Sequence, residues 1–405
     1  KINMPMSLLK IRQILLFAIV AFLFLGIGFR IGREKSVYKV TGESVKEVDT
    51  TVMNEVLARL KQYYLKPEDI EAKKLMYGAA EGMTASLGDP YTAFYPPNEN
   101  VRSKEDLQGE FGGVGIQLGY IDETLAVMAP LKGTPAEKAG IRAGDLILRI
   151  KDEAKNIDRD TSDLKIDDAV DIIRGPKGTT VILTIFHDGE NESEDIPLVR
   201  DIINVPSTEI EWLDDGKVAV LRVNKFGEQT LTEWNKMVDQ VIAQKATGVI
   251  LDLRNNPGGF LQRAVDLGEE FISGGVVVQQ RDRNTTESIE VGRSGRLIGK
   301  PLVVLINKGS ASASEILAGA LRERVGTKLV GEKSFGKGTV QEVQDLPGGA
   351  GLHVTIAEWL LPSGKNIHEE GLTPDVEVKF EFDEKNPESD NQMDKALEVL
   401  KGLIK

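Results

Sequence analysis

Short apolar runs and helical stripes of apolar residues alternate through residues 202–385. Several runs are apolar at nearly every position, as expected for strands that are covered on both faces. The stripes repeat every three to four residues, which is typical of helices. The expected strands are VAVLRV, GVILDLR, GVVV, PLVVLI, TKLV and LHVTI, and the expected helices cover residues 228–244, 260–272 and 312–325. This alternation predicts a layered α/β core.

Further helical patterns lie on either side of this core. Residues 36–101 are expected to form a helical arm, with a second helical segment at 67–87, until GDPYTAFYPPNE breaks the pattern. We expect this arm to serve packing or dimerisation, and nothing in it suggests chemistry. At the other end, residues 386–405 predict a C-terminal interaction helix with one apolar stripe and a cap at Ser389 or Asp390.

Residues 102–201 are expected to form a separate glycine-rich unit. FGGVGIQLGY alternates glycine with apolar residues, residues 166–174 predict a helix, and TPAEKAGIRAGD is similar to the short helix and turn common in bacterial PDZ domains. This combination resembles a PDZ domain, with Val114, Gly115 and Ile116 at its carboxylate-binding loop. The backbone NH groups of such a loop can hold a C-terminal carboxylate, and an exposed strand edge can add the peptide as a further strand. A β-rich domain with a purely structural role is the alternative.

Composition and charge exclude several classes of function. The 405 residues are 41% hydrophobic, which suffices for two to four globular domains. A net charge of -13 argues against a nucleic-acid surface, because phosphates require a positive patch. Cysteine is absent, so disulfides and a thiol nucleophile are impossible. His187, His353 and His368 are too far apart in sequence to form a metal-ligand motif, and no cofactor is expected.

The stretch ILLFAIVAFLFLGIGF, residues 14–29, is uncharged and has basic residues on both sides. Its length falls between a signal-peptide core and a spanning helix of about 20 residues. We expect residues 1–35 to hold a membrane anchor or a signal segment, and Gly26 and Gly28 leave cleavage open. The flanking charges are nearly balanced, so they do not decide orientation. A buried core helix is the alternative.

A strand, a sharp turn and a helix follow one another at 303–325 and carry GSASASE. This arrangement exposes a serine hydroxyl at the positive end of a helix. A lysine on a neighbouring loop can remove the hydroxyl proton if apolar surroundings keep its amine uncharged. We therefore predict a nucleophile pair of Ser312 and Lys337. The alternatives are a capping box, in which Ser312 and Glu315 only cap the helix, and an ordinary exposed loop lysine.

Two further features support this hypothesis. Gln341 follows Lys337 by four residues on an expected strand and can hold the amine without adding charge. The PGG of DLRNNPGGF offers the amide of Gly258 or Gly259, which together with the amide of Ala313 can bind a developing oxyanion. A plain glycine turn between strand and helix is the alternative.

Rival motifs in the same region are weaker. GEKSFGK nearly spells a phosphate-binding loop, but Gly338 follows where magnesium binding requires Ser or Thr. Ser334 and Lys337 spell the S-x-x-K of penicillin-recognising enzymes, a minor alternative because no S-D-N or K-T-G partner is present. No Ser-His-Asp triad is convincing, because neither His353 nor His368 lies beside a carboxylate in a known motif.

Taken in order, the helical arm, the PDZ-like unit, DLRNNPGG, GSASASEILAGAL, FGKGTVQ and LPSGKNIHEEGLTPD resemble the C-terminal processing (tail-specific) proteases from about residue 48 to 375. The resemblance implies an α/β multidomain protein with a ClpP/crotonase-like protease core at 202–385 and an inserted PDZ domain. It assigns the nucleophile to Ser312, the middle serine of SASAS, and the lysine and glutamine to Lys337 and Gln341. The acidic HEEG at 368–371 departs from the expected glycine-richer version, which can alter substrate preference.

The expected function is a serine endopeptidase that cleaves proteins at or near their C-termini. Under the resemblance, the PDZ domain captures the substrate C-terminus and controls assembly of the active site, with Arg174 implicated in that switch. Ile116 and Leu118 are expected to line its groove and to favour apolar tails. The alternative is a catalytically silent PDZ scaffold that only binds C-terminal peptides.

The expected location is the bacterial cell membrane, with a single-pass N-terminal anchor and an extracytoplasmic catalytic domain. A secreted or periplasmic protein, released by signal cleavage, is the alternative. Expected partners are protein substrates with apolar C-terminal tails and no nucleic acid. A homodimer formed through the helical arms and an adaptor or activating protein are left open.

Overall fold

The computed structural model describes residues 49–187, 190, 192–381, 386 and 389–404. The chain divides into two compact units, residues 1–72 and 73–405. The described part of the first unit holds helix α2 (Thr51–Tyr63) and a short 3-10 helix, η1 (Pro67–Asp69). The apolar stretch 14–29 lies outside the described residues. Among the helices that are described, none has the length and apolar character needed to cross a bilayer.

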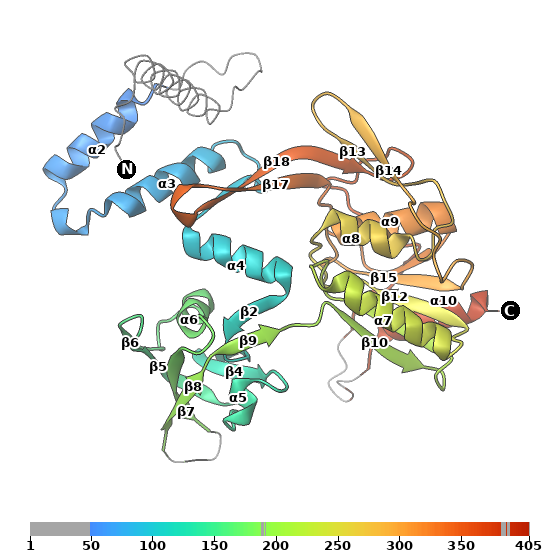
Figure 1. Ribbon diagram of the computed structural model, residues 1–405, viewed down its shortest axis with the longest axis horizontal. Helices are drawn as coiled ribbons and strands as arrows, with labels where there is room; N and C mark the ends of the chain where they lie inside the picture. The colour runs from blue at the N-terminus through green and yellow to red at the C-terminus, as the bar shows by residue number, and fades with distance from the viewer. Residues whose placement is uncertain (1–48, 188–189, 191, 382–385, 387–388, 405) are drawn as a thin grey trace, which may run out of the picture. The chain divides into compact units, whose positions relative to one another are not determined.

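The larger unit is built on a six-stranded sheet in the order β10-β11-β12-β15-β16-β19. Figure 1 labels three of these strands, β10, β12 and β15. The strands from β11 to β19 run parallel, and β10 is an antiparallel edge strand. Parallel neighbours require crossover connections, which explains why apolar runs and helical stripes alternate in the sequence. The strands are β10 (Thr208–Leu213), β11 (Val218–Val223), β12 (Gly248–Asp252), β15 (Leu302–Ile306), β16 (Lys328–Gly331) and β19 (Val376–Glu377).

Helices cover both faces of this sheet. Side chains alternate along a strand, so Ala219 and Leu221 pack with α7, α8 and α9, whereas Val218 and Val220 pack with α10. Both sets of residues must be apolar, which accounts for the uninterrupted apolar runs. The predicted layered α/β core is therefore confirmed. The helices are α7 (Thr230–Ala243), α8 (Leu261–Gly268), α9 (Ala313–Val325) and α10 (Asn391–Leu403).

A second sheet has the order β1-β18-β13-β14, with β17 also paired to β18. Its first strand comes from the region that was expected to be a helical arm. Ala93 lies opposite His353 and Tyr95 lies opposite Gly351. The helical pattern breaks here because residues that precede a proline disfavour the helical conformation, and prolines stand at 90, 96 and 97. The elements are α3 (Ala72–Ala85), β1 (Ala93–Tyr95), α4 (Pro97–Gln108), β13 (Val276–Arg281), β14 (Thr286–Glu290), β17 (Thr339–Asp345), η2 (Pro347–Gly349) and β18 (Gly351–Leu360).

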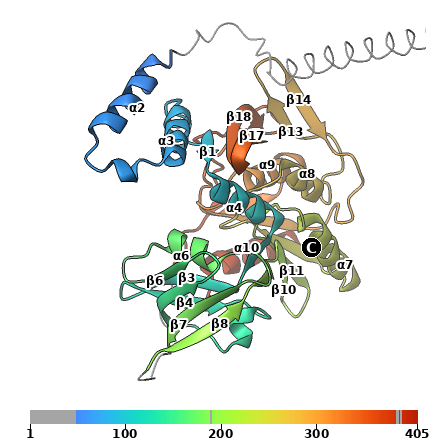
Figure 2. The same ribbon diagram turned by 60° about the vertical axis from the view of Figure 1, so that its left-hand side comes forward.

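The PDZ-like unit lies between β2 (Glu110–Gly113) and β9 (Asp201–Asn204), which pair with each other. Its sheet has the order β3-β4-β5-β7-β8, with β6 paired to β5, and it has a separate apolar core. Figure 2 shows these strands side by side, with α6 beside them. The two helices expected in this unit are present. Its elements are β3 (Ile116–Ile121), β4 (Thr124–Pro130), α5 (Pro135–Lys138), β5 (Leu146–Asp152), β6 (Ile157–Asp160), α6 (Ile166–Ile173), β7 (Thr180–Phe186) and β8 (Glu194–Val199).

Candidate active site

Ser312 lies at the N-terminus of α9, directly after the turn that leaves β15. Its backbone adopts φ 54° and ψ -116°, a conformation that residues other than glycine rarely take. Such strain costs about 1–3 kcal/mol and persists where the surrounding structure holds it, often at functional sites. The predicted strand, sharp turn and helix are therefore present, and they place Ser312 at the positive end of a helix.

The three serines of SASAS have different surroundings. The Ser310 hydroxyl donates to the carbonyl of Leu253 (2.8 Å), and the Ser314 hydroxyl donates to the carbonyl of Asn256 (2.9 Å). Both of these serines are fully buried, whereas Ser312 is partly exposed. Two of the three hydroxyls are thus occupied by the backbone, and Ser312 is the one that a substrate can reach.

Glu315 joins the start of α9 to the loop that carries Lys337. One carboxylate oxygen accepts from the amides of Ser312 (2.9 Å) and Lys337 (2.9 Å). The other accepts from the Gly336 amide (2.7 Å) and the Ser334 hydroxyl (2.5 Å). Burial raises the pKa of the Glu315 carboxyl, and these hydrogen bonds act in the opposite direction. Glu315 supplies its half of the predicted capping box by accepting from the Ser312 amide, and it also bridges two distant segments.

Lys337 is half-buried beside aromatic rings. Its Nζ lies 4.9 Å from the centroid of the Tyr91 ring, and its carbonyl accepts from the Trp359 indole at 2.9 Å. Burial lowers the pKa of the Lys337 amine below the usual 10.5, while the negative charge of Asp89 acts in the opposite direction. The amine therefore loses its proton more readily than that of an exposed lysine, as general-base catalysis requires.

Gln341 lies on β17 and is held by two hydroxyl groups. Its side-chain nitrogen donates to Thr339 (2.9 Å) and to Thr355 (3.2 Å). In the described part of the chain these contacts fix the amide, and none joins it to Lys337. The orientation of the Gln341 side chain is thus set by Thr339 and Thr355 of the same sheet.

The glycine loop packs directly against Ser312. Gly258 has φ 104°, and a Cβ built on it would lie 2.8 Å from the Ser312 Cβ, so a larger residue does not fit. The Gly258 amide donates to the Asn256 side chain at 2.9 Å. Gly259 is exposed and has φ 135°. Of the two predicted glycine donors, Gly259 therefore has the amide that is not bound to Asn256.

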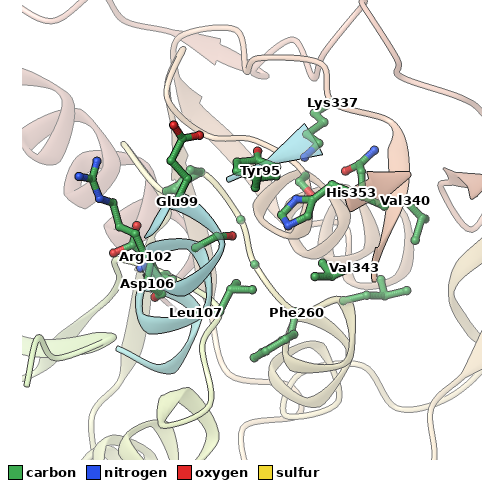
Figure 3. Close-up of a pocket in the computed structure, with 18 of the residues that line it drawn as sticks. Tyr95, Glu99, Arg102, Asp106, Leu107, Phe260, Lys337, Val340, Val343 and His353 are labelled. Carbon is green, nitrogen blue, oxygen red and sulfur yellow. Dashed lines mark hydrogen bonds between the residues drawn. The ribbon is translucent and has the colours of Figure 1, made fainter. Parts of the chain in front are cut away.

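A cavity of about 950 Å³ brings the predicted residues together. Ser312, Lys337, Gln341, Gly258 and Gly259 all line it. Figure 3 shows Lys337 and His353 on one wall, with Phe260 and Val343 below them. The apolar part of the lining can accommodate substrate side chains. Residues that the sequence pattern did not indicate also line it, among them Tyr95, Leu107, Val340 and Trp359.

The opposite wall of the cavity comes from α4 and the PDZ-like unit. Asp167, Asp168 and Asp171 of α6 line it together with Arg102 of α4. Arg102 forms an ion pair with Asp171. Arg174, which follows α6, lies 3.6 Å from Glu105 of α4. The position of the PDZ-like unit therefore determines the shape of this wall.

The residues predicted to bind a C-terminal carboxylate lie at the start of β3. Val114 is buried in the core of the unit. Gly115 has φ 78°, and a Cβ there would lie 2.4 Å from Thr134. Ile116 and Leu118 are half-buried and pack against the same core. The role of these residues in binding a C-terminal carboxylate stays a prediction, and Arg174 faces α4.

Arg254, four residues before Gly258, is the centre of a buried ion-pair network. The sequence pattern did not indicate this network. Arg254 donates to Asp252 at 2.9 and 2.8 Å and to Asp390 at 3.0 and 2.7 Å. Asp390 also caps α10, where its side chain accepts from two backbone amides. The C-terminal helix is thereby tied to the strand end that leads into Gly258. The local pattern of DLR predicts no such role for Asp252 and Arg254, because Asp390 lies 136 residues after Arg254 in the chain.

The rival sites fit less well. The Ser334 hydroxyl is buried, donates to Glu315 and accepts from the Leu372 amide at 2.7 Å, so it is not available as a nucleophile. Ser334 and Lys337 also lie outside any helix. His187 does contact carboxylates, Asp145 at 2.8 Å and Glu194 at 3.1 Å, but all three belong to the PDZ-like unit.

Comparisons with known proteins identify the family. The model of peptidase family S41 matches residues 217–378, and that of the PDZ domain matches residues 127–185. The carboxyl-terminal-processing protease of Synechocystis sp. is 36% identical over 354 residues, which cover 85% of this chain and 81% of the relative. The carboxy-terminal processing protease CtpA of Bacillus subtilis is 34% identical over 330 residues, covering 81% and 68%.

Solved structures add the fold. A structure from Bacteroides fragilis that is described as an S41 protease has a TM-score of 0.54 at 16% identity and covers 90% of this chain and 100% of its own. At this identity the likeness concerns the fold alone. The matched segments and the coverage of the Synechocystis relative carry the assignment. The chain belongs to peptidase family S41, and within it to the carboxyl-terminal processing proteases.

Proposed function

We propose that this protein is a serine endopeptidase that cleaves proteins at or near their C-termini with a Ser-Lys dyad. The observation that carries the proposal is the shared cavity, which both Ser312 and Lys337 line. The partial exposure of Ser312 and the lowered pKa of the Lys337 amine support these roles. A silent PDZ scaffold would need neither feature.

In the proposed reaction, the Ser312 Oγ attacks the carbonyl carbon of the scissile peptide while Lys337 Nζ takes its proton. Negative charge develops on the carbonyl oxygen, where the amides of Ala313 and Gly259 donate to it. The C–N bond then breaks, and Lys337 returns the proton to the leaving amine. Water releases the acyl group by the same steps, with Lys337 again as base. Gln341 is proposed to orient the amine.

Chemical labelling of the full chain tests this proposal. We expect a fluorophosphonate to modify Ser312 alone, as mapped by mass spectrometry of tryptic peptides. The adduct should disappear in Ser312→Ala and form more slowly in Lys337→Ala, because the hydroxyl is then not activated. An adduct on Ser310 or Ser314, or a β-lactam adduct on Ser334, would contradict the assignment.

The PDZ domain is proposed to capture the C-terminus of the substrate. Its β3 and α6 are in contact, and Ile116 and Leu118 of β3 have half-buried apolar side chains. A peptide added along β3 would gain main-chain hydrogen bonds, and the apolar side chains would select an apolar tail.

Replacing Leu118 with aspartate is expected to raise KM about tenfold or more for a protein with an apolar tail, because a charge would then face the tail. The kcat for a short peptide without that tail should stay unchanged. Steady-state kinetics with both substrates measures this difference, and Leu118→Met is the matched control. Equal losses on both substrates would show that the groove does not recognise the tail.

The PDZ domain is also proposed to control activity. Its helix α6 supplies part of the cavity wall, and the contacts of Arg102 with Asp171 and of Arg174 with Glu105 fix its position against α4. A substrate tail that moves α6 would therefore change access to Ser312.

We further propose that the protein is tethered to the bacterial cell membrane through residues 14–29, with its catalytic domain outside the cytoplasm. The support is the uncharged composition of that stretch and the basic residues around it. Alkaline extraction of membranes tests the tether, because a spanning segment stays in the pellet and a cleaved signal does not.

A further inference from the structure

The segment between α3 and β1 lies against the candidate base. We call residues 89–92, Asp-Pro-Tyr-Thr, the DPYT turn. The Tyr91 ring covers Lys337 Nζ at 4.9 Å from its centroid. A few residues further on, the Tyr95 ring lies 4.3 Å from that of His353, and Figure 3 shows both beside the cavity. The region that the sequence pattern assigns to packing therefore reaches the catalytic cavity, which Tyr95 lines.

The DPYT turn is held in a defined conformation. Asp89 accepts from the Tyr91 amide at 2.9 Å and from the Thr92 hydroxyl at 2.7 Å. The Thr92 hydroxyl in turn accepts from the Thr355 amide of β18 at 3.0 Å. The pairing of β1 with β18 continues this attachment. The carboxylate and the ring therefore have fixed positions relative to the sheet.

The same sheet positions Gln341. The Thr355 hydroxyl accepts from the Gln341 side chain at 3.2 Å, while the Thr355 amide binds Thr92. Thr355 is thus common to the DPYT turn and to the glutamine that follows Lys337. Thr355 of β18 therefore joins the DPYT turn to Gln341. A shift of the turn would move the groups that contact both Lys337 and Gln341.

The turn also acts on Lys337 electrostatically. Burial lowers the pKa of the amine, and the charge of Asp89 opposes this effect. Burial acts to raise the pKa of Asp89, but hydrogen bonds from Thr355, Thr92 and Tyr91 outweigh it, so the carboxylate stays ionised. The face of the Tyr91 ring also favours a cation. The other groups that face Lys337 or Tyr91 are His353 on β18, Glu315 on α9, and His368 and Glu369 in the loop after β18.

We propose that Asp89 and Tyr91 are positioning residues of the catalytic machinery: Asp89 fixes the turn that places the Tyr91 ring over the Lys337 amine, and together they govern when that amine acts as a base. The Tyr91 ring covers the amine and keeps water from it. The Asp89 carboxylate favours the protonated amine, so it delays the loss of the proton until higher pH. This inference rests on the proposed role of Lys337 as the base.

The pH dependence of kcat/KM in the full chain tests the role of Asp89. In Asp89→Asn the side-chain oxygen can still accept from the Tyr91 amide and the charge is lost, so the acidic limb of the profile should move to lower pH. Activity below that limb should therefore rise severalfold relative to wild type at the same pH. The matched control is Asp215→Asn, which removes the same charge from an exposed turn away from the cavity and should leave the limb in place.

Tyr91 is tested by a pair of variants. Tyr91→Phe keeps the ring and should retain kcat within about threefold, whereas Tyr91→Leu removes the ring face and should lower kcat about tenfold or more with little change in KM. Thermal unfolding of both variants separates a role of the ring from a loss of folding, because a leucine variant that is as stable as the phenylalanine variant but has a lower kcat has lost only the ring. Equal losses in both variants would contradict the role of the ring.

Lys337→Ala, measured in parallel, separates the two levels of inference. If Lys337→Ala retains activity, the proposed base is wrong whatever Asp89 does. If Lys337→Ala is inactive but the limb of Asp89→Asn coincides with that of wild type, the dyad stands and the inference about the DPYT turn is overturned. A shifted limb in Asp89→Asn with an unchanged limb in Asp215→Asn is the expected result.

Discussion

Replacing Lys337 with alanine is expected to lower kcat/KM about a thousandfold or more for cleavage of an unstructured protein, while binding of its C-terminal tail is retained. General-base catalysis typically contributes 10²–10⁴-fold, and a serine hydroxyl is a weak nucleophile without a base. The pKa of the Lys337 amine is lowered by burial, so it can accept a proton at a pH where exposed lysines are charged. Kinetics of tail cleavage and a separate binding assay measure the two effects.

The loop offers a matched control for this variant. Lys333 lies four residues earlier, is exposed and does not line the cavity, so Lys333→Ala should keep kcat/KM within about twofold. Lys337→Arg tests the need for an uncharged amine, because arginine is always protonated, and it should be as inactive as Lys337→Ala. If Lys337→Ala cleaves as fast as wild type, lysine is not the base. If Lys337→Arg alone is active, a positive charge is what the site requires.

Residues whose role depends on neighbours in sequence could be predicted from the sequence. The turn at Ser312 joins a strand to a helix, and both elements have clear apolar patterns. The strands of the parallel sheet were visible for the same reason, since burial on both faces leaves uninterrupted apolar runs. The order of segments then placed Lys337 on a loop beside the helix, and the structure brings both residues to one cavity.

Residues whose role depends on distant contacts could not be predicted in this way. GDPYTAFYPPNE was interpreted as a simple end to a helical arm, but Thr92 binds Thr355, 263 residues later in the chain. Asp390 was expected only to cap a helix, and it also binds Arg254. A local pattern contains the information for a cap or a break. It contains none about which remote strand that segment will pair with.

Glu315 is the clearest case, and it leads to the second large effect that we expect. S-x-x-E predicts a capping box, and one oxygen does accept from the Ser312 amide. The carboxylate also binds Ser334, Gly336 and Lys337, which lie 19 to 22 residues later. Both members of the proposed dyad are therefore held by one buried side chain, which the local motif alone could not indicate.

Glu315→Gln is expected to lower kcat about a hundredfold and the free energy of unfolding by about 2–4 kcal/mol. The amide keeps the size of the side chain, but its NH₂ group would face two donors in place of an acceptor oxygen. Each buried donor left without a partner costs about 1–3 kcal/mol, so the Lys337 loop should move away from α9. Denaturant unfolding measures the loss of stability, and kinetics at a temperature where the variant is folded measure kcat.

Glu342→Gln is the matched control, because Glu342 is exposed on β17 and accepts only from Gln344 among the hydrogen bonds of the described residues. It should leave both quantities unchanged. A stable Glu315→Gln variant with normal kcat would show that the dyad does not depend on this link. A destabilised variant with normal kcat would show that Glu315 stabilises the fold and has no role in catalysis. Because the same carboxylate binds the amides of Ser312 and Lys337, we expect stability and catalysis to fall together.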